Sequence, residues 1–186
     1  MKDSASEIMV GTVGERVCVK IAGKGTHLNS PSLREFLCEM MDTGYRRFRI
    51  DLNDCTYMDS TFLGTLVGLS MRLKPLTPEK IGITRINARN LELLQTLGIE
   101  QFFHVENNST PPPCAGQELQ ALPEQKASVE AKAETMLAAH EALADADERN
   151  VCRFKDVISF LKDDLERIKA AKAASASSSP SDPKRG

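Results

Sequence analysis

The segment formed by residues 51–66, DLNDCTYMDSTFLGTL, constrains the fold of this chain most, because its residue pattern changes period at Asp59-Ser60. Before this point, residues 46–52 alternate charged and apolar side chains, as half-buried strands do. After it, apolar residues recur at helical spacing through residues 62–73. The sequence therefore predicts a strand that passes directly into a helix, with Ser60 where the helix begins.

Ser60 has three interpretations from its position alone. Its side-chain oxygen, like that of Asp59, could accept a hydrogen bond from an N–H group of the first helical turn. No Glu or Gln follows at the third helical position to complete a capping box, so the sequence leaves open which of the two residues caps the helix. Ser60 is therefore a cap alone, a phosphorylated switch, or an unmodified part of a docking surface.

The residues around this segment alternate predicted strands with predicted helices. Short β-branched runs at residues 8–12 and 16–21 indicate a hairpin, and further strands are predicted at residues 80–86 and 101–105. Helical patterns begin near Asn29-Ser30 and end before Gly44, and a short one covers residues 90–97. This alternation predicts an α/β protein with a mixed sheet of about five strands and about three helices.

The composition changes after residue 105. Three consecutive prolines, at residues 111–113, favour an extended spacer, and two amphipathic helical patterns joined by a polar turn then predict an antiparallel helical hairpin. The end of the chain is rich in Ala and Ser, which is typical of a disordered tail. The predicted parts are an α/β domain (1–108), a Pro-rich linker (109–122), a helical hairpin (123–172) and a disordered tail (173–186).

The apolar stripes of the hairpin must be buried against something, because two isolated helices are marginally stable. They could pack on the α/β domain of the same chain or on the hairpin of a second chain. The Pro-rich spacer and the length of the second stripe favour the second arrangement, a homodimer through the C-terminal hairpin.

Gly64 and Gly68 lie one turn apart on a stripe beside the apolar residues of the predicted Ser60 helix. Glycine lets a helix approach its neighbour closely, because no Cβ separates the two backbones. The pair therefore predicts close packing of this helix on the sheet.

Composition excludes several classes of protein. The formal net charge is −2, which argues against a nucleic-acid partner. No apolar run reaches the roughly 18 residues of a membrane span, and the first residues, MKDSASE, lack the apolar core of a signal peptide. We therefore expect a cytoplasmic protein without a membrane span.

No set of residues has the spacing of a catalytic, metal or cofactor site. The three histidines, His27, His104 and His140, fall in different predicted elements, and His140 lies in an apolar stripe, where packing is the expected role. The segment Gly23-Lys24-Gly25-Thr26 lacks the first glycine of a phosphate-binding loop and predicts a turn. The chain is therefore predicted not to be an enzyme and to need no cofactor or metal.

The chain has five cysteines. Because this number is odd and the cysteines lie far apart in the sequence, we expect reduced thiols rather than disulfides or a zinc site. Cys55 lies near Ser60, but burial is expected to decide its role, because no basic neighbour is evident that would lower its pKa. The full set is Cys18, Cys38, Cys55, Cys114 and Cys152.

The motif Asp51-Leu52, Asp59-Ser60-Thr61 and Leu63-Gly64 resembles the signature of STAS domains, the sulfate-transporter and anti-sigma-antagonist family, over about the first 108 residues. In bacterial anti-sigma factor antagonists of this family, the serine that matches Ser60 is phosphorylated by a partner that is both a serine protein kinase and an anti-sigma factor. The resemblance implies phosphorylation of Ser60, reversal by a serine phosphatase, and a partner surface. The partner-binding residues would be Asp59, Thr61, Phe62 and Leu63.

The sequence departs from the family pattern at three places. Asn53 stands where a serine is usual, Phe62 where many antagonists carry glycine, and residues 23–28 lack an acidic residue that often precedes the first helix. A phenylalanine at a docking surface would add a large apolar group that a partner must accommodate. The resemblance therefore implies the fold, and the departures predict a different partner specificity.

Together these features predict a non-catalytic bacterial signalling module, similar to an anti-sigma factor antagonist, that is switched by phosphorylation of Ser60. A phosphate at a helix N-terminus lies at the positive end of the helix dipole, so the fold need not rearrange. The alternative is a structural STAS adaptor subunit of a signalling scaffold or of a lipid-transport ATPase, which phosphorylation does not regulate.

Overall fold

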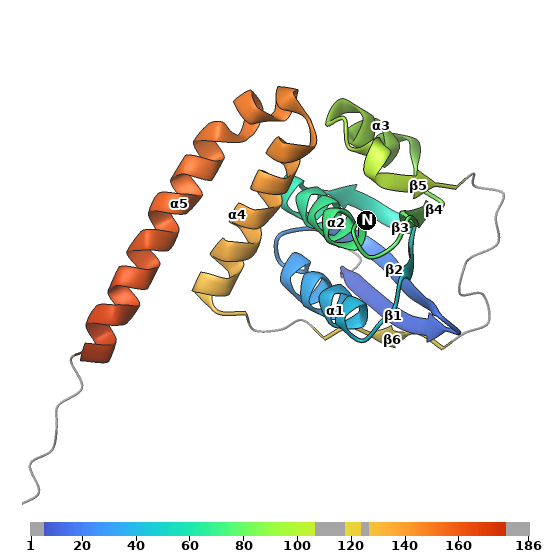
Figure 1. Cartoon of the computed structure of the whole chain (residues 1–186), viewed down its shortest axis with the longest axis horizontal. Helices are drawn as coiled ribbons and strands as arrows, with labels where there is room; N and C mark the ends of the chain where they lie inside the picture. The colour runs from blue at the N-terminus through green and yellow to red at the C-terminus, as the bar shows by residue number, and fades with distance from the viewer. Residues whose placement is uncertain (1–5, 107–117, 124–126, 178–186) are drawn as a thin grey trace, which may run out of the picture.

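The computed structural model describes residues 6–106, 118–123 and 127–177 of the chain. Its elements follow the predicted alternation of strands and helices and then a pair of helices (Figure 1). In chain order they are β1 (Glu7–Val13), β2 (Arg16–Gly25), α1 (Ser30–Asp42), β3 (Arg47–Met58), α2 (Ser60–Leu73), β4 (Ile81–Thr84), α3 (Ala88–Thr96), the 3-10 turn η1 (Glu100–Phe102), β5 (Phe103–Val105), β6 (Gln120–Ala121), α4 (Val129–Ala146) and α5 (Glu148–Ser177).

The strands form one mixed sheet in the order β5-β4-β3-β2-β1-β6. β1 pairs antiparallel with β2 and β6, whereas β2, β3, β4 and β5 are joined by parallel pairs. The α/β class and the mixed sheet are thereby confirmed. The sixth strand was not expected: β6 is two residues long, lies within the predicted linker, and is too short to leave a periodic signal.

The core lies between the sheet and helices α1 and α2, which lie side by side over it (Figure 1). Alternate residues of β2 and β3 point into this layer, as the period of a strand requires. α1 contributes residues at helical spacing. The central side chains are at most 2% exposed: Val17, Val19, Ile21, Leu33, Leu37, Met41, Phe48, Ile50 and Leu52.

Among the cysteines that the structure describes, Cys18 departs from the expectation of reduced thiols. Cys18, buried in β2, is disulfide-bonded. Cys38, Cys55 and Cys152 carry free thiols, and Cys114 lies outside the described residues. Burial raises the pKa of the Cys55 thiol, so this side chain packs as a small apolar group, as predicted from the sequence.

The C-terminal helices form the predicted antiparallel hairpin, and α4 lies between α5 and α2 (Figure 1). Apolar side chains join α4 to α5, with Leu143 fully buried and Phe154, Leu161 and Leu165 at most 9% exposed. Exposed ion pairs such as Lys162–Glu141 and Lys169–Glu134 add little. α5 continues to Ser177, past the predicted start of the tail at residue 173, because its alanines favour helix.

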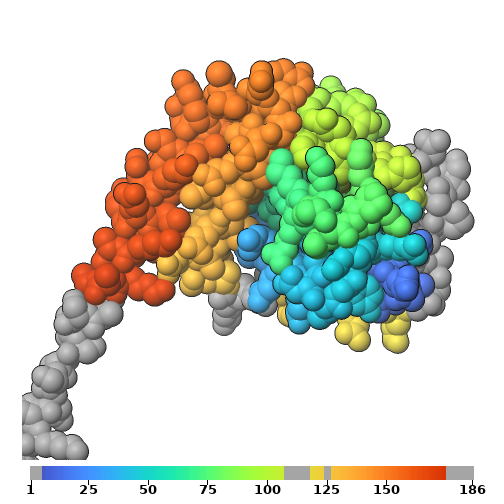
Figure 2. Space-filling view, viewed as in Figure 1, coloured from blue at the N-terminus to red at the C-terminus, as the bar shows by residue number. Residues whose placement is uncertain are grey.

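α4 packs on α2 of the α/β domain of its own chain, and α5 packs on α4 while Val157 and Phe160 of α5 remain exposed. Figure 2 shows the orange hairpin along the flank of this domain, against the green surface of α2 and α3. Packing on the domain of the same chain thus buries part of the predicted apolar stripes, and the homodimer through the hairpin stays a prediction. Among the described residues, no helix combines the length and apolar character that crossing a membrane requires.

Candidate functional site at the start of α2

Asp59, not Ser60, caps α2. Its backbone is extended, with φ −90° and ψ 171°, and its Oδ1 accepts a hydrogen bond of 2.8 Å from the N–H of Phe62. β3 ends at Met58 and α2 begins at Ser60, so the change of period correctly predicted this junction. The Ser60 hydroxyl is therefore not needed to begin the helix.

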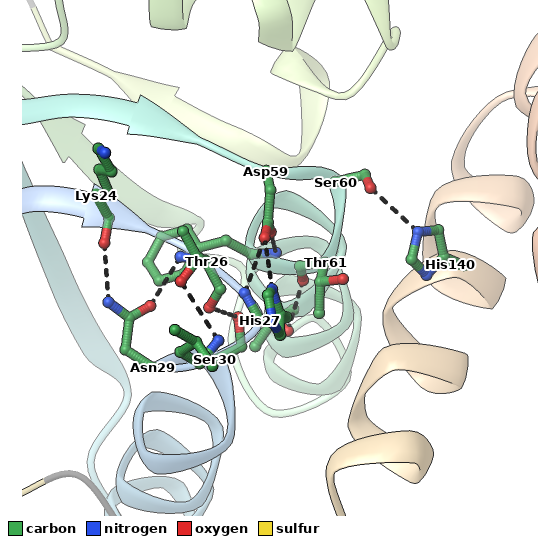
Figure 3. A network of polar contacts seen from close by, with 12 residues as sticks. Lys24, Thr26, His27, Asn29, Ser30, Asp59, Ser60, Thr61 and His140 are labelled. Atoms are coloured by element: carbon green, nitrogen blue, oxygen red, sulfur yellow. Dashed lines mark hydrogen bonds and ion pairs between the residues drawn. The ribbon is translucent and has the colours of Figure 1, made fainter. Parts of the chain in front are cut away.

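The second carboxylate oxygen of Asp59 ties α2 to the loop between β2 and α1 (Figure 3). Oδ2 accepts a 2.9 Å hydrogen bond from the N–H of His27 and lies 3.3 Å from His27 Nδ1. The N–H of Asp59 donates to the carbonyl of Gly25. Sequence reasoning had treated His27 and Asp59 separately. Parallel pairing of β2 with β3 brings them together, because both residues follow the ends of those strands.

Ser60 contacts α4 through His140, which lies 80 residues further along the chain (Figure 3). The Ser60 Oγ is 3.1 Å from His140 Nε2, and His140 Nδ1 is 2.7 Å from the carbonyl oxygen of Met136. A carbonyl only accepts, so Nδ1 carries the proton and, in the neutral ring, Nε2 accepts from the Ser60 hydroxyl. The hydrogen-bond partners thus assign the tautomer.

His140 is also a packing residue, as its place in the apolar stripe predicted. Its side chain is 5% exposed, and its ring meets the ring of Phe154 edge-on, with centroids 5.3 Å apart. The hydrogen bond to Ser60 was not predicted. The only signal in the sequence was a histidine in an otherwise apolar stripe, and that signal does not identify a partner.

Gly64 and Gly68 lie on the same side of α2 as Ser60, and this side faces α4. The prediction that the two glycines pack on the sheet is wrong. A Cβ on Gly64 would overlap the carbonyl oxygen of Ala139, so the α2 and α4 backbones touch there. A Cβ on Gly68 would lie 3.7 Å from that of Ala142. Larger residues of α2 fill the core on its other side. We call Ser60, Gly64 and Gly68 the α2 stripe.

The residues predicted to bind a partner differ in exposure. Ser60 is half-buried, and the Asp59 side chain is 20% exposed. Thr61 and Leu63 are 3% and 2% exposed. Phe62 is fully buried and its ring packs on Gly25, so it adds no exposed apolar group to this surface, and its effect on partner specificity stays a prediction. Phe62 lies on the side of α2 that faces the end of β2, so its ring points into the core.

Neither metal-ligand clusters nor cavities in the described part of the chain indicate a metal or cofactor site around Ser60. No group of three His, Cys, Asp or Glu side chains converges within the described part of the chain. A cavity of about 610 Å³ is lined by residues such as Gly14, Tyr45 and Arg47. These residues lie where β2 and β3 begin, at the end of the sheet opposite Ser60. Polar side chains at the start of α2 include those of Ser60 and Asp59, with the rings of His27 and His140 beside them.

Comparisons with known proteins cover the α/β domain. A family model described as "Mlab, STAS domain" matches residues 8–106, and α4 and α5 lie outside this match. The anti-sigma-B factor antagonist of Staphylococcus aureus strain NCTC 8325 is 30% identical over 91 residues, which are 49% of this chain and 83% of that protein.

Solved structures of anti-sigma factor antagonists are also similar. The antagonist from Mycobacterium paratuberculosis has a TM-score of 0.49 and 17% identity, and the match covers 56% of this chain and 87% of the other. Unphosphorylated SpoIIAA has a TM-score of 0.49 and 14% identity, with 54% and 88% covered.

Proposed function

The chain belongs to the STAS domain family, and from this premise we propose that it is a non-catalytic anti-sigma factor antagonist switched by phosphorylation of Ser60. Unphosphorylated, the start of α2 binds a serine protein kinase that is also an anti-sigma factor. Phosphorylation of Ser60 ends that binding, and a serine phosphatase restores it. The antagonists to which the chain is similar support this role.

The observation that carries the proposal is that Asp59 caps α2, so the helix does not need the Ser60 hydroxyl as its cap. A phosphate on Ser60 would keep the cap and would lie at the positive end of the helix dipole. It would add a charge of about −1.5 to −2 to the surface, enough to weaken a docked partner. The surface at the start of α2 changes while the fold of the α/β domain is kept.

Asp59 and Ser60 are the proposed centre of the partner surface, because both have exposed atoms. Asp59 also holds His27, so the loop after β2 belongs to the same surface. Thr61 and Leu63 are proposed as partner contacts only in a state in which the start of α2 is less covered. Phe62 supports this surface indirectly, because its buried ring packs on Gly25 at the end of β2.

The pairing of Ser60 with His140 is one half of a nucleophile–base arrangement, but its surroundings support a non-catalytic role. A hydrolase needs space for a reacting atom about 3 Å from both the hydroxyl and its oxyanion donors. The backbone of α4 occupies the space beside Gly64, one turn along the α2 stripe. His140 itself is 5% exposed.

The same hydrogen bond favours the alternative function, a structural adaptor subunit of a signalling scaffold or of a lipid-transport ATPase. There, the Ser60–His140 contact would be permanent, and Ser60 would never be modified. Proteins that co-purify with the chain distinguish the two functions: a serine kinase for the switch, scaffold or transporter subunits for the adaptor.

Mass spectrometry of the protein isolated from its own cells tests the proposal directly. We expect phosphate on Ser60 in a fraction of the molecules, and we expect the Ser60→Ala variant to bind the kinase without accepting phosphate. Ser60→Asp should weaken that binding, because it adds negative charge at the docking surface. Equal phosphorylation of Ser60→Ala and the wild-type chain would reject Ser60 and make Thr61 the next candidate.

A further inference from the structure

The hairpin is attached to the α/β domain at sites along its length, beyond the α2 stripe. At its turn, the buried side chain of Asn150 donates hydrogen bonds to the carbonyls of Leu97, 2.8 Å, and Leu143, 2.9 Å. It thus joins the end of α3 to the end of α4. Gly98 has φ +64°, and a Cβ there would overlap the Asp147 carboxylate. The turn therefore packs directly on the domain.

The contact at Ser60 leaves little space between the two helices. His140 cannot swing away from Ser60 at low cost, because Nδ1 is held by the Met136 carbonyl and the ring packs on Phe154. Nor can α4 move closer or slide freely, since its backbone already touches Gly64 one turn further along. The position of the imidazole is set from several sides.

A phosphoryl group on the Ser60 Oγ would need the volume that the imidazole occupies, since Oγ and Nε2 are only 3.1 Å apart. The hydroxyl would also lose the proton that it donates to Nε2. The lone pair of Nε2 would then face phosphate oxygens, which are acceptors as well. Contact between α4 and a phosphorylated Ser60 is therefore unfavourable by volume and, with the neutral imidazole, also by hydrogen bonding.

We propose that the α2 stripe is a helix-binding surface whose occupant in the unphosphorylated chain is α4, and that phosphate on Ser60 excludes α4 from it. α4 then competes with the partner for the start of α2, and phosphorylation separates α4 from the α2 stripe. This mechanism rests on Ser60 as the phosphorylated residue. It concerns the hairpin rather than the identity of the kinase, so it can be tested without a kinase.

A disulfide between α2 and α4 reports whether the hairpin is docked. The variant Gly68→Cys/Ala142→Cys places two Cβ atoms about 3.7 Å apart, within the 3.5–4.5 Å typical of disulfides. Cys38, which lines a cavity together with Gly68, and the exposed Cys152 are replaced by serine in every variant to prevent mispairing. The rate of disulfide formation in the full-length chain is then measured by mass spectrometry.

Phosphoserine is installed at position 60 during translation. We expect the α2–α4 disulfide to form at least about tenfold more slowly than with serine at this position, which corresponds to about 1.4 kcal/mol. Ser60→Ala should slow its formation by no more than about fivefold, because the substitution removes one hydrogen bond to His140 without adding volume. Thr43→phosphoserine, at the exposed opposite end of α1, is the control for added charge and should leave the rate unchanged.

An unchanged or faster rate with phosphoserine at position 60 would overturn the proposal, because α4 would then tolerate or bind the phosphate. Hydrogen–deuterium exchange on chains without the added cysteines provides a second measurement. Amides of residues 139–143 should lose protection with phosphoserine at position 60, while β2 and β3 keep theirs. Failure to find a kinase would reject the proposed function but would leave this exclusion of α4 by phosphate intact.

Discussion

The two sides of α2 differ in the size of their side chains and in how firmly they are held. Toward the core, Phe62 and Leu66 are fully buried and packed on the sheet. Toward α4, the α2 stripe offers one hydroxyl and two glycines, and its only side-chain hydrogen bond there among the described residues is that of Ser60. Large interlocking side chains make a permanent interface, whereas a shallow stripe with one polar contact suits a reversible one.

The largest expected effect comes from the core side. Phe62→Ala should lower the free energy of unfolding of the domain by about 3–5 kcal/mol, because it leaves a cavity beside Gly25. Denaturant unfolding followed by circular dichroism measures this loss. A loss below about 1 kcal/mol would mean that Phe62 is not a core residue, and would restore it as a surface residue for a partner.

The two glycines of the α2 stripe provide a matched pair one turn apart. Gly64→Ala should weaken hairpin docking by about 1–3 kcal/mol, because its Cβ would overlap the Ala139 carbonyl. Gly68→Ala should stabilise the chain by about 0.5–1 kcal/mol, since its Cβ would make an ordinary contact and alanine favours helix.

Hydrogen exchange of α4 and denaturant unfolding together distinguish these two glycine variants. Loss of protection in α4 is expected for Gly64→Ala alone. Equal effects of the two substitutions would show that helix propensity, and not contact with α4, governs this face.

Asp59→Ala removes the cap of α2 and should cost about 0.5–2 kcal/mol of unfolding free energy. Asp59→Asn is the control, because an asparagine oxygen still caps the helix and only the charge is lost. The comparison is made by thermal unfolding of both variants. A stable Asp59→Ala variant would indicate that Ser60 takes over the cap, contrary to the geometry.

The smallest effect is expected for Ser60→Ala. It removes one hydrogen bond to His140 and should weaken hairpin docking by about 0.5–1 kcal/mol without changing the stability of the sheet. Exchange of α4 amides should rise slightly, and exchange in β2 and β3 should not. Complete release of the hairpin by Ser60→Ala would mean that this single bond, and not the backbone contact at Gly64, holds α4.

The elements that follow a local period were predictable from the sequence, whereas the pairings between them were not. The period switch at Asp59-Ser60 located the start of α2, and the prolines and amphipathic stripes located the hairpin. β6 and the disulfide at Cys18 left no such pattern. Their formation depends on which segments the fold brings into contact.

The sequence by itself determined the α/β order of elements, the serine at the start of α2 and the presence of a second helical unit, because backbone propensity and the spacing of apolar residues act over a few residues. Only the tertiary structure decided that Asp59 caps α2, that Phe62 turns inward, and that His140 meets Ser60. The fold brings the loop of His27 to the second oxygen of Asp59 and the end of β2 to the ring of Phe62. The Ser60–His140 contact spans 80 residues of chain, and its geometry is set when α4 packs on the glycines of α2.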